Sequence, residues 1–152
     1  TMERFDLTEL IQGVINASAI LLNQNEITLN FSQQEPLFAW ADEFKVEEVV
    51  TNYLSNAIHH AEGEKRIDIR CVKKDDKVRV SVFNTGKPIP EEDVDNIWIK
   101  FYKVDKARTR EYGGSGIGLS IVQAIMDSFH QKCGVINHED GVEFWFELDA
   151  KS

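Results

Sequence analysis

A run of cations followed by glycines suggests a phosphate-binding segment. The stretch from Lys100 to Arg110 carries five cationic side chains against one carboxylate, Asp105, and leads into Gly113–Leu119, which contains four glycines. Without a Cβ, such residues let backbone N–H groups converge on an anion, and a helix that begins there adds the positive end of its dipole. Apolar spacing predicts that helix from Ser115 to about Phe129, and we interpret Tyr102–Gly114 as a lid.

Two asparagines on an earlier helix could bind a metal ion. Apolar residues at helical spacing predict a helix from Asp42 to about Ala61. Asn52 and Asn56 lie four residues apart on it and therefore share a stripe beside the apolar face. A carboxamide oxygen is a hard ligand that suits Mg²⁺, and the cation can bridge the phosphates of a nucleotide. The alternative is a pair of solvated helix asparagines.

Asn84 is predicted to be a buried polar residue at the end of a strand. It follows Val78, Val80 and Val82 at two-residue spacing, so it shares their face and points to the interior. A buried carboxamide needs a hydrogen-bonding partner, which a ligand can provide. The alternative is an Asn turn before Gly86.

In this order and at these distances, the segments resemble the conserved boxes of the ATP-binding domain of sensor histidine kinases, in the GHKL superfamily. The N box corresponds to Asn52–Ala57, the G1 box to Asn84–Pro90, the F box to Phe101–Lys103 and the G2 box to Gly113–Leu119. The resemblance extends from about Phe5 to Leu148 and implies the Bergerat fold, not a Rossmann or P-loop fold.

The resemblance also implies roles for single residues. Asn56 would hold Mg²⁺, and Asn84 replaces an Asp whose carboxylate accepts a hydrogen bond from the adenine amino group. Asn84 can still accept through its carbonyl oxygen, but it lacks the charge and adds an NH₂ donor. Gly86 would allow close backbone approach, and Ile89 would pack near the base.

Phosphate contacts are implied for several cations. Lys103 and Arg110 are the main candidates, with Arg108 beside them, since guanidinium groups bind phosphate oxygens in a bidentate manner. His59 takes a position where relatives often have Lys, and is interpreted as an auxiliary phosphate donor or as a helix-surface histidine. Phe101 and Tyr102 are expected to anchor the lid by burial. The predicted nucleotide-binding residues are Asn52, Asn56, His59, His60, Asn84, Gly86, Ile89, Tyr102, Lys103, Arg108, Arg110, Gly114, Ser115, Gly116, Ile117, Gly118 and Leu119, with Asn52, Lys103 and Arg110 as the catalytic set.

Length and composition predict one soluble domain over residues 1–152. The net charge of −9 argues against a nucleic-acid partner, and 42% apolar residues are typical of a globular protein. Cys71 and Cys133 form no metal-binding or disulfide pattern, which favours a reducing cytosol. No run of residues reaches the roughly 20 apolar residues of a membrane span.

The expected fold is α+β: a two-layer α/β sandwich with a mixed sheet of about five strands and three helices on one face. The first helix should run from Leu7 to about Leu22 behind an Asp6 cap. A short helix is expected near Glu91 to Trp98. Strands are predicted at residues 27–31, 37–40, 66–72, 78–84, 133–137 and 142–148.

The main functional hypothesis is the catalytic domain of a two-component sensor kinase. By resemblance, it would transfer the γ-phosphoryl group of Mg-ATP to a His on an upstream helical dimerisation domain, from which a response-regulator Asp receives it. We expect the isolated domain to be a cytoplasmic monomer and the intact parent to be a homodimeric, membrane-bound bacterial sensor. His138-Glu139 superficially resembles a phosphoacceptor box. Because the pair lies at a predicted strand turn, we do not interpret His138 as a phosphoacceptor.

Two alternatives stay open. One is a GHKL ATPase clamp, although such families usually place a catalytic Glu four residues before the metal Asn, where this chain has Asn52. The other is a nucleotide-binding module that transfers nothing.

Overall fold

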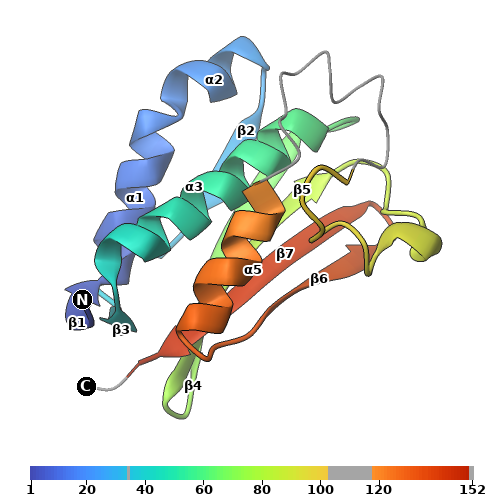
Figure 1. Cartoon of the computed structure of the whole chain (residues 1–152). Helices are drawn as coiled ribbons and strands as arrows, with labels where there is room; N and C mark the ends of the chain where they lie inside the picture. Colours follow the sequence, from blue (N-terminus) through green and yellow to red (C-terminus); the bar gives the residue numbers. More distant parts are fainter. Residues whose placement is uncertain (34, 103–117, 151–152) are drawn as a thin grey trace.

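The computed structural model describes residues 1–33, 35–102 and 118–150, which form helices packed on one face of a mixed sheet (Figure 1). The strands are β1 (Glu3–Asp6), β2 (Thr28–Phe31), β3 (Phe38–Ala41), β4 (Arg66–Lys74), β5 (Lys77–Thr85), β6 (Cys133–His138) and β7 (Gly141–Asp149). The helices are α1 (Leu7–Ala17), α2 (Ala19–Gln24), α3 (Glu43–His60) and α5 (Gly118–Ser128), with a 3₁₀ turn η1 at Glu91–Asp93.

The sheet runs in the order β1-β3-β7-β5-β4-β2, and β6 pairs with β7. Strand β2 pairs with β4 in parallel, whereas the other pairs are antiparallel, so the predicted mixed sheet and two-layer architecture are confirmed. The expected count of about five strands was too low, since the described residues form seven. Strand β1 was missed because its four residues gain their extended form by pairing with β3, more than 30 residues away.

The first predicted helix is two helices. Asp6 caps α1 as expected, because its side chain accepts a hydrogen bond from the Glu9 N–H at 3.1 Å. The helix ends at Ala17, and Ser18 adopts φ −96° and ψ 1° before α2 begins. The break reorients the chain so that Leu22 is buried while Ile20 is 73% exposed.

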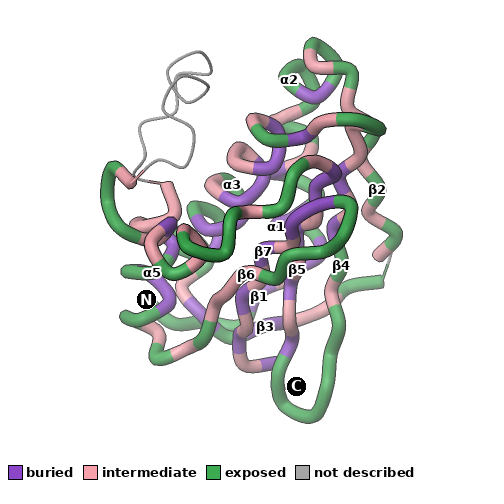
Figure 2. Tube along the Cα trace, turned by 90° about the vertical axis from the view of Figure 1, so that its right-hand side faces the viewer, coloured by how far each residue is buried: buried purple, intermediate pink, exposed green. Residues whose placement is uncertain are grey.

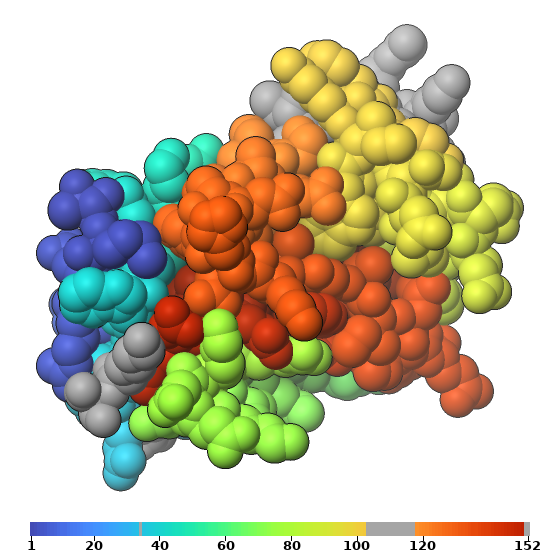
Figure 3. All heavy atoms as spheres, turned by 60° about the horizontal axis from the view of Figure 1, so that its bottom comes forward, coloured from blue at the N-terminus to red at the C-terminus, as the bar shows by residue number. Residues whose placement is uncertain are grey.

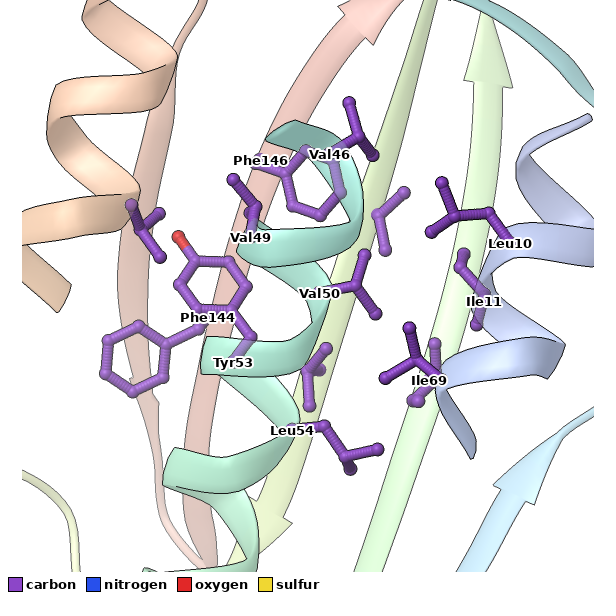
Figure 4. Close-up of a cluster of buried hydrophobic side chains, with 14 of the residues drawn as sticks. Leu10, Ile11, Val46, Val49, Val50, Tyr53, Leu54, Ile69, Phe144 and Phe146 are labelled. Atoms are coloured by element: carbon purple, nitrogen blue, oxygen red, sulfur yellow. The ribbon is translucent and has the colours of Figure 1, made fainter. Parts of the chain in front are cut away.

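Helix α3 provides the central packing surface. Figure 4 shows its sheet-facing side chains against residues of α1 and of strands β4 and β7: Val46, Val49, Val50, Tyr53 and Leu54 meet Leu10, Ile11, Ile69, Phe144 and Phe146. The Tyr53 ring lies 5.4 Å from that of Phe144, and its hydroxyl donates to the Trp145 carbonyl at 2.9 Å. Burial raises the pKa of Tyr53, so this donor stays protonated.

Burial is concentrated where α3 faces β5 and β7, and the connecting segments are exposed (Figure 2). Each Val, Leu or Ile side chain buried in this layer contributes about 1.5 to 3 kcal/mol. These contacts set the rotation of α3 on the sheet. The opposite side of the helix is thereby left free to carry polar residues.

The segment after β5 contains less helix than expected. Only Glu91–Asp93 form a 3₁₀ turn, where an α-helix was predicted near Glu91–Trp98. The backbone hydrogen bonds that follow all span three residues, including Asn96 N–H to Asp93 O at 2.9 Å and Ile99 N–H to Asn96 O at 3.0 Å. Such turns let the chain bury Ile97 without a full helical face. Among the described residues no helix is long and apolar enough to cross a membrane.

Candidate functional site

The two helices that were predicted to bind nucleotide contact each other directly. Asn52 lies on α3, where its Nδ2 donates to the Glu48 carbonyl at 2.9 Å. Its Oδ1 faces the start of α5: a Cβ added to Gly118 would lie 2.9 Å from that oxygen. The absence of a side chain at Gly118 therefore makes room for the Asn52 carboxamide. The structure thus brings together the N box and the end of the G2 box.

Asn56 lies one helical turn further along α3 and is half-buried. Within the part of the chain that the structure describes, its carboxamide makes no hydrogen bond, so both its oxygen and its nitrogen are open to a ligand. The described residues also contain no group of three or more His, Cys, Asp or Glu side chains that could cage a metal. An amide oxygen as the protein ligand fits Mg²⁺, which usually keeps waters and substrate phosphates in its shell.

Asn84 is 2% exposed and ends the inward-facing row of β5, as the strand period predicted. Its Nδ2 donates to the Thr85 carbonyl at 3.1 Å. The extra donor that Asn has relative to Asp is therefore satisfied inside the protein. No described residue donates to its Oδ1, which leaves that oxygen as an acceptor for a ligand.

The end of β5 is tied to the residues after α3. Thr85 is buried, and its hydroxyl donates to the Glu62 carbonyl at 2.8 Å and accepts from the Arg66 N–H at 3.0 Å. The Glu62 N–H in turn donates to the Thr85 carbonyl at 2.9 Å. Gly86 has φ +149°, and a Cβ there would lie 2.8 Å from the His60 carbonyl oxygen. Glycine is thus required where the G1 segment passes the end of α3.

The two histidines at the end of α3 differ in environment. His59 is half-buried, and burial lowers its pKa, which favours the neutral ring at pH 7. As a phosphate partner it is thus a hydrogen-bond donor more than a cation. His60 is exposed and meets the G1 segment through its backbone carbonyl.

The predicted burial of the lid anchors is wrong for Phe101. This residue is 63% exposed at φ +68°, and its ring lies 5.2 Å from the Lys100 ammonium. The preceding three-residue turns direct it away from the core, which Ile97 enters instead. Tyr102 is held by polar contact: its hydroxyl donates to the Asp93 carboxylate, and this bond raises the pKa of Tyr102.

Several predicted site residues lie outside the described part of the chain. They are Lys103, Arg108, Arg110, Gly114, Ser115, Gly116 and Ile117, together with most of the predicted lid. Of the G2 box, the structure places Gly118 and Leu119 at the start of α5, and Leu119 packs partly buried against the core.

Asn137 of β6 was missed by sequence reasoning. Its Oδ1 accepts from the Ile89 N–H at 2.9 Å, and its Nδ2 donates to the Ile89 carbonyl at 2.8 Å. No local pattern indicates this contact, because the two residues lie 48 positions apart. His138, next to it, forms a 2.8 Å hydrogen bond with Glu143 and an edge contact with Phe83, which agrees with a structural role.

Two surface cavities lie beside the site. One of 330 Å³ is lined by Gly86, Thr85, Lys87 and Asp140, among others. The other, of 270 Å³, is bordered by His59 and Lys65. Neither is lined by Asn56 or by Asn52, and the side chain of Asn52 faces α5.

Comparisons with known proteins agree with this geometry. The profile of the family described as "Histidine kinase-, DNA gyrase B-, and HSP90-like ATPase" matches residues 41–152. The sensor protein kinase WalK of Staphylococcus epidermidis is 34% identical over 131 residues, which are 84% of this chain and 21% of WalK. The chain therefore spans about a fifth of the length of that relative.

Solved structures show the same fold. The nucleotide-free catalytic domain of the histidine kinase ThkA has a TM-score of 0.87 and 33% identity, with 99% of this chain and 96% of that domain covered. A complex of ThkA with the response regulator protein TrrA has a TM-score of 0.80 and 31% identity, with 99% of this chain and 42% of the ThkA chain covered.

Proposed function

The chain belongs to the histidine kinase-, DNA gyrase B- and HSP90-like ATPase family, as a catalytic domain of the sensor histidine kinase type, and we propose that it binds Mg-ATP and donates the γ-phosphoryl group to a histidine. The observation that carries the proposal is the double contact of α3. Its Asn52 lies against Gly118, and its His60 carbonyl lies against Gly86. One helix therefore connects the segment assigned to the base with the segment assigned to the phosphates.

At the base end, the Asn84 carboxamide is proposed to accept a hydrogen bond from the adenine amino group. Its Nδ2 is already bonded to the Thr85 carbonyl, which fixes the orientation of Oδ1. A preoriented acceptor discriminates well, because a base without a matching donor would leave it unpaired.

At the phosphate end, Asn56 is proposed to bind Mg²⁺ through Oδ1, and Asn52 to orient the phosphates beside Gly118. When bound, Mg²⁺ would neutralise charge on the transferred group. Lys103, Arg108 and Arg110 are proposed as phosphate-binding cations, and His59 as a neutral donor. Since an amide cannot accept a proton at neutral pH, Asn52 provides no general base for water, which favours transfer over hydrolysis.

The acceptor histidine is proposed to come from a helical dimerisation domain of the intact protein, and a response regulator to receive the phosphoryl group next. The intact protein is proposed to be a homodimeric bacterial sensor bound to the membrane. Phosphoryl transfer depends mainly on positioning and charge neutralisation, so the nucleophile can be supplied by a separate domain.

Calorimetric titration of the domain with a non-hydrolysable ATP analogue, with and without Mg²⁺, tests the first step. We expect binding that Mg²⁺ strengthens. Asn56→Ala should abolish that enhancement, whereas the control Asn16→Ala, an exposed helix asparagine on α1, should not. Mg²⁺ dependence that survives in Asn56→Ala would contradict the metal assignment.

The second step needs the phosphoacceptor domain of the intact protein, added together with labelled ATP. Label should appear on that domain's histidine and then on a regulator. Steady ATP hydrolysis by the isolated domain, lost in Asn56→Ala, would favour an ATPase clamp instead.

A further inference from the structure

The segment that leaves β5 has one backbone hydrogen-bond donor between two prolines. Pro88 and Pro90 lack an N–H, so the Ile89 N–H is the sole donor of that tripeptide. Lys87 and Ile89 both precede a proline and are therefore biased toward extended conformations. The segment is consequently stiff and extended, but it has too few donors to join a β-ladder.

The side chain of Asn137 on β6 takes the place of the backbone hydrogen bonds that this segment cannot form with a strand. Its carboxamide pairs with both backbone groups of Ile89, at 2.9 Å from the Ile89 N–H to Oδ1 and 2.8 Å from Nδ2 to the Ile89 carbonyl. This is the reciprocal arrangement that two residues of adjacent antiparallel strands would make through their main chains. A further hydrogen bond, from the Gly86 N–H to the Asp140 carbonyl at 3.0 Å, connects the start of the segment to the β6–β7 turn.

The surrounding structure gives the segment few other attachments. Lys87, Pro88 and Pro90 are exposed, and only Ile89 is half-buried and packed against the core. Figure 3 shows the atoms that follow β5, in yellow, directly against those of α5 and β6, in orange to red. The position of Ile89 therefore depends on its own packing and on the Asn137 side chain.

We infer that Asn137 is a positioning residue for the base of the nucleotide, which it holds indirectly by fixing Ile89. The inference rests on the proposed function, with Asn84 recognising the base, and on the role that the resemblance implies for Ile89, which is to pack near that base. We call the two hydrogen bonds between Asn137 and Ile89 the Asn137 clamp. Because the Asn137 clamp acts on the G1 segment alone, its loss should weaken binding of the adenosine part of the nucleotide and leave binding of the triphosphate part unchanged. The competing interpretation is that Asn137 only attaches this segment to the edge strand β6 and has no effect on nucleotide binding.

The test compares Asn137→Ala with a matched control, Asn30→Ala. Asn30 is also an asparagine on a strand, and its Nδ2 donates to the Asp68 carboxylate at 2.9 Å, but it lies on β2, away from β6 in the sheet. Four quantities are measured for each protein: the hydrogen-exchange rate of the Ile89 amide, the Kd of a non-hydrolysable ATP analogue, the Kd of inorganic triphosphate, and the thermal midpoint of unfolding.

In Asn137→Ala we expect faster exchange at Ile89 and a loss of about five- to tenfold in affinity for the analogue, as for two solvent-exposed hydrogen bonds. The Kd of triphosphate and the thermal midpoint should stay close to those of the parent. Asn30→Ala should change none of these.

Each other outcome has a distinct meaning. Faster exchange at Ile89 with unchanged analogue affinity would overturn the positioning role. An equal loss for analogue and triphosphate would overturn it too, because it would indicate general damage to the site. If the parent binds no analogue, the proposed function fails and the role at the base fails with it, while the Ile89 exchange rate still decides whether Asn137 holds the segment.

Discussion

Gly118→Ala should separate nucleotide binding from stability. An alanine Cβ at this position would lie 2.9 Å from Asn52 Oδ1, 3.7 Å from its Cγ and 3.9 Å from its Cβ. The first distance is shorter than a carbon–oxygen contact allows, whereas the others are ordinary. All three atoms belong to one flexible side chain. The carboxamide is therefore expected to rotate away while the backbone of both helices stays in place.

The effect on folding should be small because two terms oppose each other. Rotation of Asn52 removes its bond to the Glu48 carbonyl, at a cost of about 0.5 to 1.5 kcal/mol. Replacing a helical glycine by alanine favours the helix by at most about 1 kcal/mol. The thermal midpoint should thus move by no more than about 6 °C, since the net loss is at most about 1.5 kcal/mol. Binding should suffer more, because a hydrogen bond from Asn52 to a charged phosphate is worth about 1.5 to 3 kcal/mol, or roughly ten- to a hundredfold in Kd.

The assay pairs thermal unfolding with titration of a non-hydrolysable Mg-ATP analogue. Gly13→Ala is the control, since Gly13 lies in α1 with no atom within 4 Å of its added Cβ. That variant should be slightly stabilised and bind like the parent. Unchanged affinity in Gly118→Ala would refute the role of Asn52, and a midpoint lowered by much more than about 6 °C would refute the assumption that only a side chain moves.

Three further outcomes are expected. Asn84→Ala should weaken the ATP analogue by about 1 to 3 kcal/mol and leave inorganic triphosphate unaffected, as titration of both ligands would show. The Cys71 thiol, whose pKa burial raises to about 12, should react with iodoacetamide at pH 8 far more slowly in the native protein than in urea. Burial lowers the pKa of His59, so the unfolded chain binds more protons near the ordinary histidine value, and stability should fall as pH drops through about 6.5. In urea titrations at pH 5.5 and 7.5, His59→Gln should reduce that difference.

Elements with a strong internal period were predictable. Helix α3 and strand β5 carry their apolar residues at regular spacing, and that spacing placed Asn84 inside and Asn52 outside the core. The Asp6 cap was also predictable, because its hydrogen bond spans three residues.

Features that depend on partners distant in the sequence were not predictable. Strand β1 exists through its pairing with β3, and the Asn137 clamp joins residues 48 positions apart. The exposure of Phe101 follows from a series of three-residue turns that replaces the expected helix. In the first two cases tertiary contacts, which no sequence window contains, outweigh local preference.

The hydrogen bonds between Asn137 and Ile89 also bear on the outer edge of strand β6. Strand β6 pairs with β7 and, within the described residues, with no other strand, so its outer side is a sheet edge of the kind that can recruit a strand from another molecule. The segment Pro88–Pro90 lies along that side and is attached through Asn137. Its one backbone N–H, that of Ile89, is already bonded to Asn137 and cannot pair with a strand of another molecule. A single exposed amide therefore holds a stiff segment beside this edge. A chain that loses it would become prone to edge-to-edge association even where its fold and its core are intact.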